Sequence, residues 1–401
     1  MFDWAKSILS DQFSFSILLA LASIGAILTS VAYCILLERK ISAWMQDRFG
    51  PNRVGPGGLL QPLADGLKFL LKEDIIPRHV DKALFLLAPW LIFVVAMVGF
   101  AVLPIGGAFR WSWMPADAAP LLCQVASVDI GLLYMVAIAS LGVYGVVLGA
   151  WASNNKYSFY GGMRAAAQML SYEVPMGMAI LTVILTTGQL RLENIVAAQA
   201  AGPWIVLYHP VAALLLFIAA LAEANRMPFD LAESEQELIG GYHTEYSAMK
   251  LALFFLAEYA HMITTSGLMT ALFFGGYLLP SWFPGAAFVN GEATATAMIA
   301  RSLVFGGKIA LFISLYMAVR WTIPRFRFDQ LMRVAWKGLV PISMALVALQ
   351  GVIVYLRVSQ WWATAGNLAI MVGALIVASA ARKPITGRQQ SLPMKAMVSR
   401  G

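Results

Sequence analysis

The chain has 401 residues, of which 60% are hydrophobic and 12% charged, and its formal net charge is +7. Soluble domains carry about 25% charged residues, so this composition excludes an ordinary soluble fold and indicates a membrane protein. The four histidines form no HExxH pair, and the two cysteines, Cys34 and Cys123, are far apart in the sequence, which argues against a metal centre, an iron–sulfur cluster or a disulfide framework in this chain.

Nine apolar runs follow one another along the sequence. They occupy residues 14–37, 83–105, 127–150, 169–187, 204–222, 249–279, 302–319, 338–356 and 363–381. Most are close to the roughly 20 residues that a helix needs to cross a bilayer core of about 30 Å. Because lipid cannot satisfy a bare backbone, each run is predicted to be a helix. We therefore expect an all-α polytopic membrane protein with eight or nine transmembrane helices.

Basic residues are concentrated on one side of the predicted bilayer. The segments after the first, third, fifth and seventh runs, together with the tail after Ala381, contain 22 of the 28 Lys and Arg residues. Cytoplasmic loops retain Lys and Arg, so the N-terminus is predicted to lie outside and the C-terminus in the cytoplasm. The positive net charge then reflects topology rather than a surface for nucleic acid.

The first cytoplasmic segment begins at residues 38–40 and is too long for a simple turn. Glycines and prolines make residues 50–56 an irregular, stiff loop. From Leu59 to Asp74 leucines fill one side of a predicted helix, and polar residues at helical spacing fill the other: Gln61, Asp65, Lys68 and Lys72. This helix would lie along the membrane surface, either as an anchor or as one wall of a cavity for an amphipathic ligand.

Acidic residues gather between the fifth and sixth runs, where Arg226 alone opposes them in the sequence. They are Glu223, Asp230, Glu233, Glu235, Glu237 and Glu245. If residues 232–238 are helical, Glu233 and Glu237 lie at positions i and i+4, and burial would raise the pKa of at least one of them toward neutrality. Such carboxyls can store and transfer protons. The alternative is a solvated acidic face.

Charged residues also lie within the predicted helices. Glu173 begins the fourth just before Pro175, Glu258 lies inside the sixth, and Lys308 lies inside the seventh. A charge at mid-bilayer costs roughly 2.5–3.5 kcal/mol, so each side chain should face protein or water. Carboxyls that step from the loop to Glu258 indicate a proton relay. Alternatively, these charges fix helix packing through hydrogen bonds.

Three arginines follow the seventh run, at positions 320, 325 and 327. Arginine stays charged and offers a planar set of donors, so it can hold carboxylates of a partner subunit or polar head groups. A plain positive-inside signal is the alternative role.

Several of these segments together resemble the quinone-site membrane subunit of respiratory complex I. In bacteria this is the H-type membrane subunit of NADH-quinone oxidoreductase, which has a counterpart in the mitochondrial complex. The matching stretches are Glu38 to Lys40, Asp47 to Pro56, Leu59 to Asp74, Trp151 to Ser158, Glu223 to Leu231, Glu235 to Leu238, Tyr242 to Tyr246 and Pro324 to Asp329. The usual pattern of this family has eight helices. The resemblance therefore implies a membrane domain over residues 1–357, followed by an extra ninth helix and a basic tail over residues 358–401.

The resemblance also implies a lateral tunnel for a ubiquinone-like molecule, framed by the first helix, the surface helix and the sixth helix. The residues at the tunnel or its mouth would be Arg39, Arg48, Asp65 and Arg320. The acids that connect this chamber to the proton-pumping membrane arm would be Glu173, Glu223, Glu233, Glu235, Glu237, Glu245 and Glu258. Contacts with partner subunits would involve Arg53, Lys72, Arg325 and Arg327.

By the same resemblance, partner subunits of the peripheral arm would hold NADH, FMN and iron–sulfur clusters, and electrons would reach the quinone from one of these clusters. The other neighbours would be membrane-arm subunits, including antiporter-like ones, and lipid of the bacterial inner membrane. No metal, redox centre or nucleic acid is expected on this chain. Ala232, Ser234 and Trp321 depart from the usual family pattern, and the bulk of Trp321 puts the packing around Arg320 in doubt.

Two other functions stay open at this point. One is the homologous membrane subunit of an energy-converting hydrogenase, which reduces no quinone; residues 50–56 and the surface helix argue against it by family analogy. The other is a stand-alone ion transporter, which would transport ions without partner subunits. The sequence shows no internal repeat, which weakens the transporter hypothesis.

Overall fold

A computed structural model describes residues 10–115, 117, 119–232, 239–291 and 293–380. The α-helices are α2 (Gln12–Met45), α3 (Gln61–Leu71), α4 (Lys82–Val98), α5 (Gly131–Ala152), α6 (Lys156–Thr187), α7 (Leu192–Ala200), α8 (Ile205–Tyr208), α9 (Pro210–Glu223), α11 (Ala248–Phe273), α12 (Ala286–Gly291), α13 (Ala295–Thr322), α14 (Phe328–Val334), α15 (Val340–Tyr355) and α16 (Trp361–Ala380). Short 3₁₀ turns are η1 (Pro56–Gly58), η2 (Gly99–Val102) and η3 (Gly241–His243), and a π-helical segment, η4 (Ala335–Leu339), joins α14 to α15. Strands β1 (Ala108–Phe109) and β2 (Leu121–Leu122) pair antiparallel, with Ala108 opposite Leu122.

Eight helices in the described part of the chain are long and apolar enough to cross a membrane. They are α2, α4 with η2, α5, α6, α11, α13, α14 continued through α15, and α16. Helix α9 is apolar but has 14 residues, about 21 Å at 1.5 Å per residue. The predicted all-α polytopic membrane fold is confirmed.

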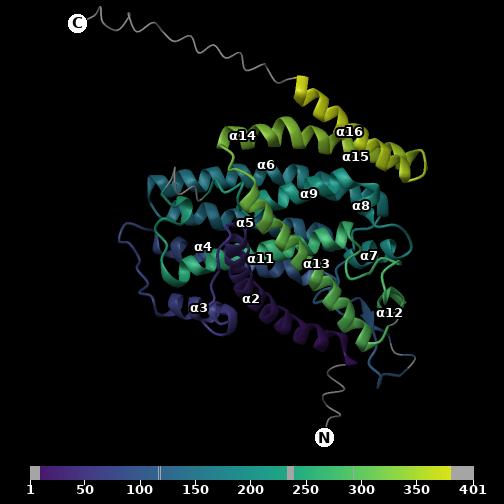
Figure 1. Cartoon of the computed structure of the whole chain (residues 1–401), viewed down its shortest axis with the longest axis horizontal. Helices are drawn as coiled ribbons and strands as arrows, with labels where there is room; N and C mark the ends of the chain where they lie inside the picture. The colour runs from purple at the N-terminus through teal and green to yellow at the C-terminus, as the bar shows by residue number, and fades with distance from the viewer. Residues whose placement is uncertain (1–9, 116, 118, 233–238, 292, 381–401) are drawn as a thin grey trace, which may run out of the picture.

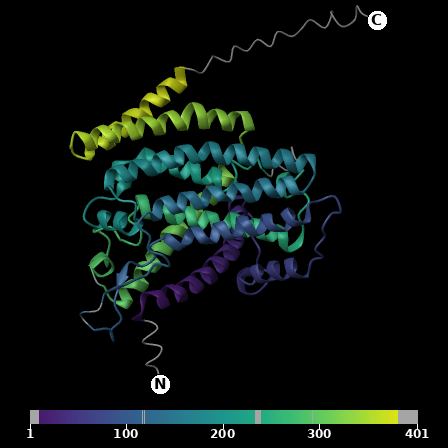
Figure 2. The same cartoon turned by 180° about the vertical axis from the view of Figure 1, so that it is seen from behind.

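The helices form a bundle with two oblique members (Figure 1). Helices α4, α5, α6, α9 and α11 run roughly side by side, and α2 and α13 cross them at an angle. Helix α3 lies beside the end of α2. The pair α15 and α16 lies at the opposite edge of the bundle from α2 and α3, as the view from behind also shows (Figure 2).

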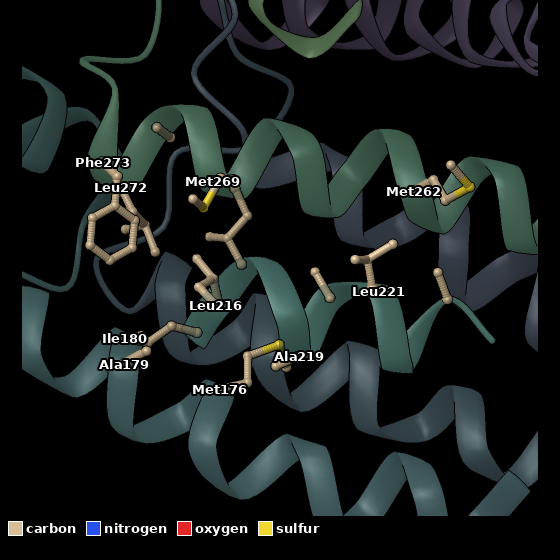
Figure 3. Close-up of a cluster of buried hydrophobic side chains, with 14 of the residues drawn as sticks. Met176, Ala179, Ile180, Leu216, Ala219, Leu221, Met262, Met269, Leu272 and Phe273 are labelled. Atoms are coloured by element: carbon tan, nitrogen blue, oxygen red, sulfur yellow. The ribbon is translucent and has the colours of Figure 1, made fainter. Parts of the chain in front are cut away.

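The main hydrophobic core lies between α6, α9 and α11. In Figure 3, Met176 of α6, Leu216 of α9 and Met269 of α11 point toward one another. Helix α11 is the most enclosed of the spanning helices, because 78% of the residues in its apolar stretch are buried inside the protein. Small residues let membrane helices approach closely, and a Cβ added at Gly267 of α11 would lie 2.6 Å from Leu103. The core therefore holds α11 in a fixed position.

The apolar run at residues 204–222 does not form one helix, and that prediction is wrong. His209 has non-helical angles (φ −129°, ψ 60°) and separates α8 from α9, which begins at Pro210. Proline lacks the backbone N–H but fits the first turn of a helix, so the break falls at this point.

Two other helices extend beyond their apolar runs. Helix α2 continues to Met45, so residues 38–40 belong to its last turns rather than to a loop. Helix α6 begins at Lys156, which places Glu173 in its interior and not at its start. In the extension of α6, Gln168 Nε2 donates to the carbonyl oxygens of Ala222 and Phe229, both at 2.7 Å. Hydropathy underestimates the length of such helices because it counts their polar residues as loop.

The C-terminal helix α16 is attached to the bundle by polar contacts as well as by packing against α15 and α9. Thr364 donates to the carbonyl of Leu207 at 2.9 Å, and Asn367 Nδ2 lies 3.3 Å from Nδ1 of the buried His209. Helix α16 is thus an integral part of this fold.

Lys308 lies within α13 and caps the end of α11. Its Nζ donates to the carbonyl oxygens of Phe274 at 2.7 Å, Gly276 at 2.9 Å and Leu278 at 2.6 Å. The ammonium also lies 4.4 Å from the centroid of the Trp204 ring. Each of its three protons has an acceptor, so Lys308 faces protein and fixes helix packing.

The substitution Lys308→Met keeps the aliphatic stem but removes this charged donor. We expect it to destabilise the protein by about 2–3 kcal/mol, because three carbonyl oxygens lose their shared partner. The thermal unfolding midpoint of the detergent-solubilised protein measures this effect. Lys337→Met is the matched control, since Lys337 is exposed; equal midpoints for the two variants would contradict the capping role.

Candidate functional site

A cavity of about 430 Å³ opens between α2, α3 and α11. Its polar lining comes from Glu38, Arg39, Gln61, Asp65, Arg226, Tyr259 and Arg320. Its apolar lining includes Ile35, Leu36, Phe69, Leu70, Phe255 and Leu256. A cavity of this size, with a mainly apolar wall and a few convergent polar groups, has the usual form of a small-molecule site.

Helix α3 forms one wall of this cavity. Asp65 Oδ2 accepts a hydrogen bond from Arg39 Nη1 of α2 at 2.7 Å, and Gln61 Nε2 donates to Asp65 Oδ1 at 3.2 Å. The polar stripe of α3 therefore faces α2, whereas Leu63 and Leu71 on the other side are 64% and 84% exposed. The predicted amphipathic helix is confirmed, and its residues line a cavity.

The loop before α3 folds back on the end of α2. Gly58 has a φ of +83°, and a Cβ added there would lie 2.1 Å from the carbonyl oxygen of Pro51, so the position requires glycine. Lys40 Nζ donates to the carbonyl of Gly57 at 2.7 Å. These contacts fix where α3 begins relative to α2.

Glu38 joins three helices beside the cavity. It accepts hydrogen bonds from the hydroxyl of Tyr259 on α11, at 2.6 Å, and from Arg320 Nη1 on α13. The guanidinium of Arg320 also lies 5.6 Å from the centroid of the Trp321 ring. The bulk of Trp321 thus packs beside Arg320 while the ion pair with Glu38 is kept.

Arg226 connects the cavity to the interior of the bundle. It lines the cavity, its guanidinium lies 4.1 Å from the centroid of the Tyr259 ring, and its Nη2 lies 3.0 Å from Glu258 Oε2. The hydroxyl of Tyr242 donates to the other oxygen of Glu258 at 2.9 Å. The side chains of Arg226 and Glu258 are 10% and 4% exposed. Because removing one partner of a buried ion pair is costly, the charge of Glu258 depends on Arg226.

Of the other predicted acids in the described residues, Glu223 lines a small cavity together with Glu258. Glu223 is buried at the end of α9, and its Oε2 lies 3.5 Å from His261 Nε2. Glu173 in α6 instead accepts a hydrogen bond from Ser140 of α5. Glu245 accepts one from Asn155 Nδ2 at 2.7 Å, near the start of α6. Glu233, Glu235 and Glu237 lie outside the described residues.

The remaining predicted site residues lie away from the cavity lining. Arg48 Nε donates to Gln46 Oε1 at 2.7 Å in the loop after α2. Arg325 Nη2 donates to Asp230 Oδ2 at 2.7 Å, so this arginine pairs within the chain. The side chains of Arg53, Lys72 and Arg327 are exposed on the surface.

A larger cavity of about 810 Å³ lies between α2 and α13. Leu36 lines both cavities. Among the described residues, Lys40 is the one charged side chain that lines the larger cavity, so the smaller cavity is the one with the polar chemistry of a specific site. In the described part of the chain, no group of three or more His, Cys, Asp or Glu side chains could hold a metal ion.

Sequence reasoning missed four residues of this region as site residues: Glu38, Arg226, Tyr259 and His261. The sequence contained a signal for two of them, Arg226 and His261. Arg226 is the one basic residue among the acids of its segment, and His261 follows Glu258 by three positions, on the same face of an apolar helix. Glu38 and Tyr259 meet through the tertiary fold, 221 positions apart in the sequence.

Comparison with known proteins shows the family of this chain. A family model described as NADH dehydrogenase matches residues 18–351. The chain is 48% identical over 326 residues to the H-type subunit of NADH-quinone oxidoreductase from Leptospira biflexa serovar Patoc, covering 80% of this chain and 89% of that protein. It is 46% identical over 326 residues to an H-type subunit from Cytophaga hutchinsonii (81% and 92% covered) and 45% identical over 339 residues to the one from Rhodospirillum rubrum (83% and 92% covered). The chain belongs to the NADH dehydrogenase family, among the H-type membrane subunits of NADH-quinone oxidoreductase.

Proposed function

We propose that this chain is the quinone-binding membrane subunit of a proton-translocating NADH:quinone oxidoreductase. The observation that carries the proposal is the cavity between α2, α3 and α11, in which an apolar wall meets Arg39, Asp65, Arg226 and Arg320. Membership of the family of H-type subunits supports the assignment to this complex. NADH, FMN and iron–sulfur clusters belong to peripheral-arm subunits in this proposal, and the membrane is the bacterial inner membrane, with the N-terminus outside.

A quinone matches the chemistry of this cavity. Its carbonyl oxygens accept hydrogen bonds, which arginine side chains donate, and its ring and isoprenoid tail are apolar. Arg39 and Arg226 line the cavity as donors, and Phe69, Leu70 and Leu256 supply apolar surface. The paired Asp65 orients Arg39 at 2.7 Å, so the donor is held in place before the ligand arrives.

Arg226 supplies the link between quinone reduction and proton movement. Reduction of a quinone to a quinol takes up two electrons and two protons, and negative charge forms on its oxygens before the protons arrive. That charge attracts the guanidinium of Arg226, which also pairs with Glu258 at 3.0 Å. As the pair weakens, Glu258 binds a proton, and it releases the proton when the quinol leaves and Arg226 returns. Glu223, Glu245, Glu173 and the acids at positions 233, 235 and 237 are the proposed further members of the proton path.

The substitution Asp65→Asn tests the quinone site. It keeps the size of the side chain but removes the charge that holds Arg39, so we expect the KM for quinone to rise about fivefold, the effect of losing roughly 1 kcal/mol of binding. NADH oxidation by an artificial acceptor that does not need the quinone should be unchanged. Asp329→Asn is the matched control, because Asp329 pairs with Arg333 at 3.0 Å on the surface. A normal KM in the assembled Asp65→Asn complex would contradict the site.

Glu258→Gln tests the coupling role. Glutamine keeps the shape but carries no proton, so in the assembled complex, reconstituted into vesicles, we expect quinone-linked turnover and proton pumping to fall together by at least about tenfold. Glu237→Gln should have the same effect if that acid belongs to the path. Glu73→Gln, at an exposed position, is the control.

Normal turnover and pumping in the assembled Glu258→Gln complex would refute the coupling role. A nickel–iron centre in the co-purified complex would instead indicate a hydrogenase, and ion transport by the isolated chain in vesicles would indicate a stand-alone transporter.

A further inference from the structure

Two small cavities continue from Glu258 into the bundle, and His261 lines both. The first, of about 30 Å³, is lined by Glu258, Glu223, Asn225 and His261 among others. The second, of about 20 Å³, is lined by Glu223, His261 and Thr265 among others. A cavity needs about 10–15 Å³ to hold a water molecule, so each has room for one. Glu223 and His261 are the two titratable residues common to both linings.

His261 lies between the two buried acids. It follows Glu258 by three positions on α11, which places both side chains on one face of the helix. Its Nε2 lies 3.5 Å from Oε2 of Glu223, the last residue of α9, and the two side chains are 16% and 9% exposed. Figure 3 shows the apolar neighbours of this pair, Leu221 of α9 and Met262 of α11, on facing sides of the two helices.

We propose that His261 passes protons between Glu258 and Glu223. The inference rests on the proposed function, because it concerns one step of the proton path. A carboxyl proton leaves Glu258 through a water molecule in the 30 Å³ cavity and binds the neutral imidazole of His261, and the imidazolium then releases a proton to Glu223. At the end Glu258 is ionised, Glu223 is protonated and His261 is neutral again. Imidazole suits this step because it can bind a proton at one ring nitrogen and release one from the other.

Among the described residues that line the two cavities, the titratable ones are Glu223, Glu258 and His261. No other side chain in these linings can therefore carry the proton. The charged groups that line the two cavities with His261 are Glu258 of α11 and Glu223 of α9, and Arg226 pairs with Glu258. The described residues of α4, α5 and α6 that line the two cavities are uncharged: Ile92, Val95, Ala96, Met135, Val136, Ala139, Gly142, Met169 and Met176. Glu173 of α6 is absent from both linings and pairs with Ser140.

The variants His261→Asn and His261→Gln test the proposal in the assembled complex. Both keep a polar amide but cannot carry a proton at neutral pH. We expect an unchanged KM for quinone, because His261 does not line the 430 Å³ cavity, and a fall of about tenfold or more in the kcat of coupled turnover and in proton pumping. The ratio of kcat in H₂O to kcat in D₂O should rise, because proton transfer becomes rate-limiting. Two variants are used so that poor assembly of one leaves the test intact.

Substitution of a histidine with a purely structural role would change thermal stability but not the isotope ratio. His209→Asn makes the same substitution at another buried histidine, whose Nε2 lies 2.8 Å from Thr186 Oγ1 at the far end of α9; it should lower thermal stability but leave the isotope ratio unchanged. If the assembled His261 variants behave like His209→Asn while Glu258→Gln slows coupled turnover, the role of His261 is refuted and the proposed function stands. If Glu258→Gln also keeps full activity, the proton path itself fails, and the role of His261 with it.

Discussion

Lipid offers no hydrogen bonds, and this constraint limits where the polar side chains of the bundle can lie. In a membrane, a buried donor or acceptor has to find its partner within the protein. Lys308 finds three carbonyl oxygens at the end of α11, Gln168 finds those of Ala222 and Phe229, and Glu38 finds Tyr259 and Arg320. These contacts join helices that lie far apart in the sequence. The same constraint explains why the few charges in the core strongly affect the stability of the fold.

The site differs from the rest of the core because its charges form a chain instead of closed pairs. Glu38, Tyr259, Arg226 and Glu258 contact one another in succession from the cavity inward. Each of these side chains contacts the next one, so a change of charge on one side chain alters the electrostatic energy of its neighbour. Electrostatic interactions are strong at this depth, where few water molecules can screen them. An arrangement of this kind can transmit the charge of a bound ligand without a large movement of helices.

The sequence was sufficient to predict the helical membrane fold, the amphipathic helix α3 and three residues of the cavity: Arg39, Asp65 and Arg320. Hydropathy and helical periodicity are local properties, and the family resemblance indicated which of the matched motifs meet in space. The predictions failed where tertiary contacts override local signals. Helix α6 is longer than its apolar run, and its added part includes Gln168, whose side chain donates hydrogen bonds to carbonyl oxygens of the protein. A break at His209 divides the apolar run at residues 204–222 into two helices. The role of Arg226 could not be read from its segment alone, because its partner Glu258 lies 32 positions later, on another helix.

The unequal attachment of the cavity walls has a consequence for how a ligand enters. The walls on α2 and α11 are tied together through Glu38, whereas α3 has no buried residue among its eleven, and its Arg39–Asp65 pair is 46% and 20% exposed. Exposed pairs contribute about 0–1 kcal/mol and are screened by salt, and segments with few buried contacts open first. Helix α3 is therefore the least enclosed wall of the cavity, and α2 and α11 are the more firmly joined walls. Ionic strength should therefore weaken the attachment of α3 more than the contacts between α2 and α11.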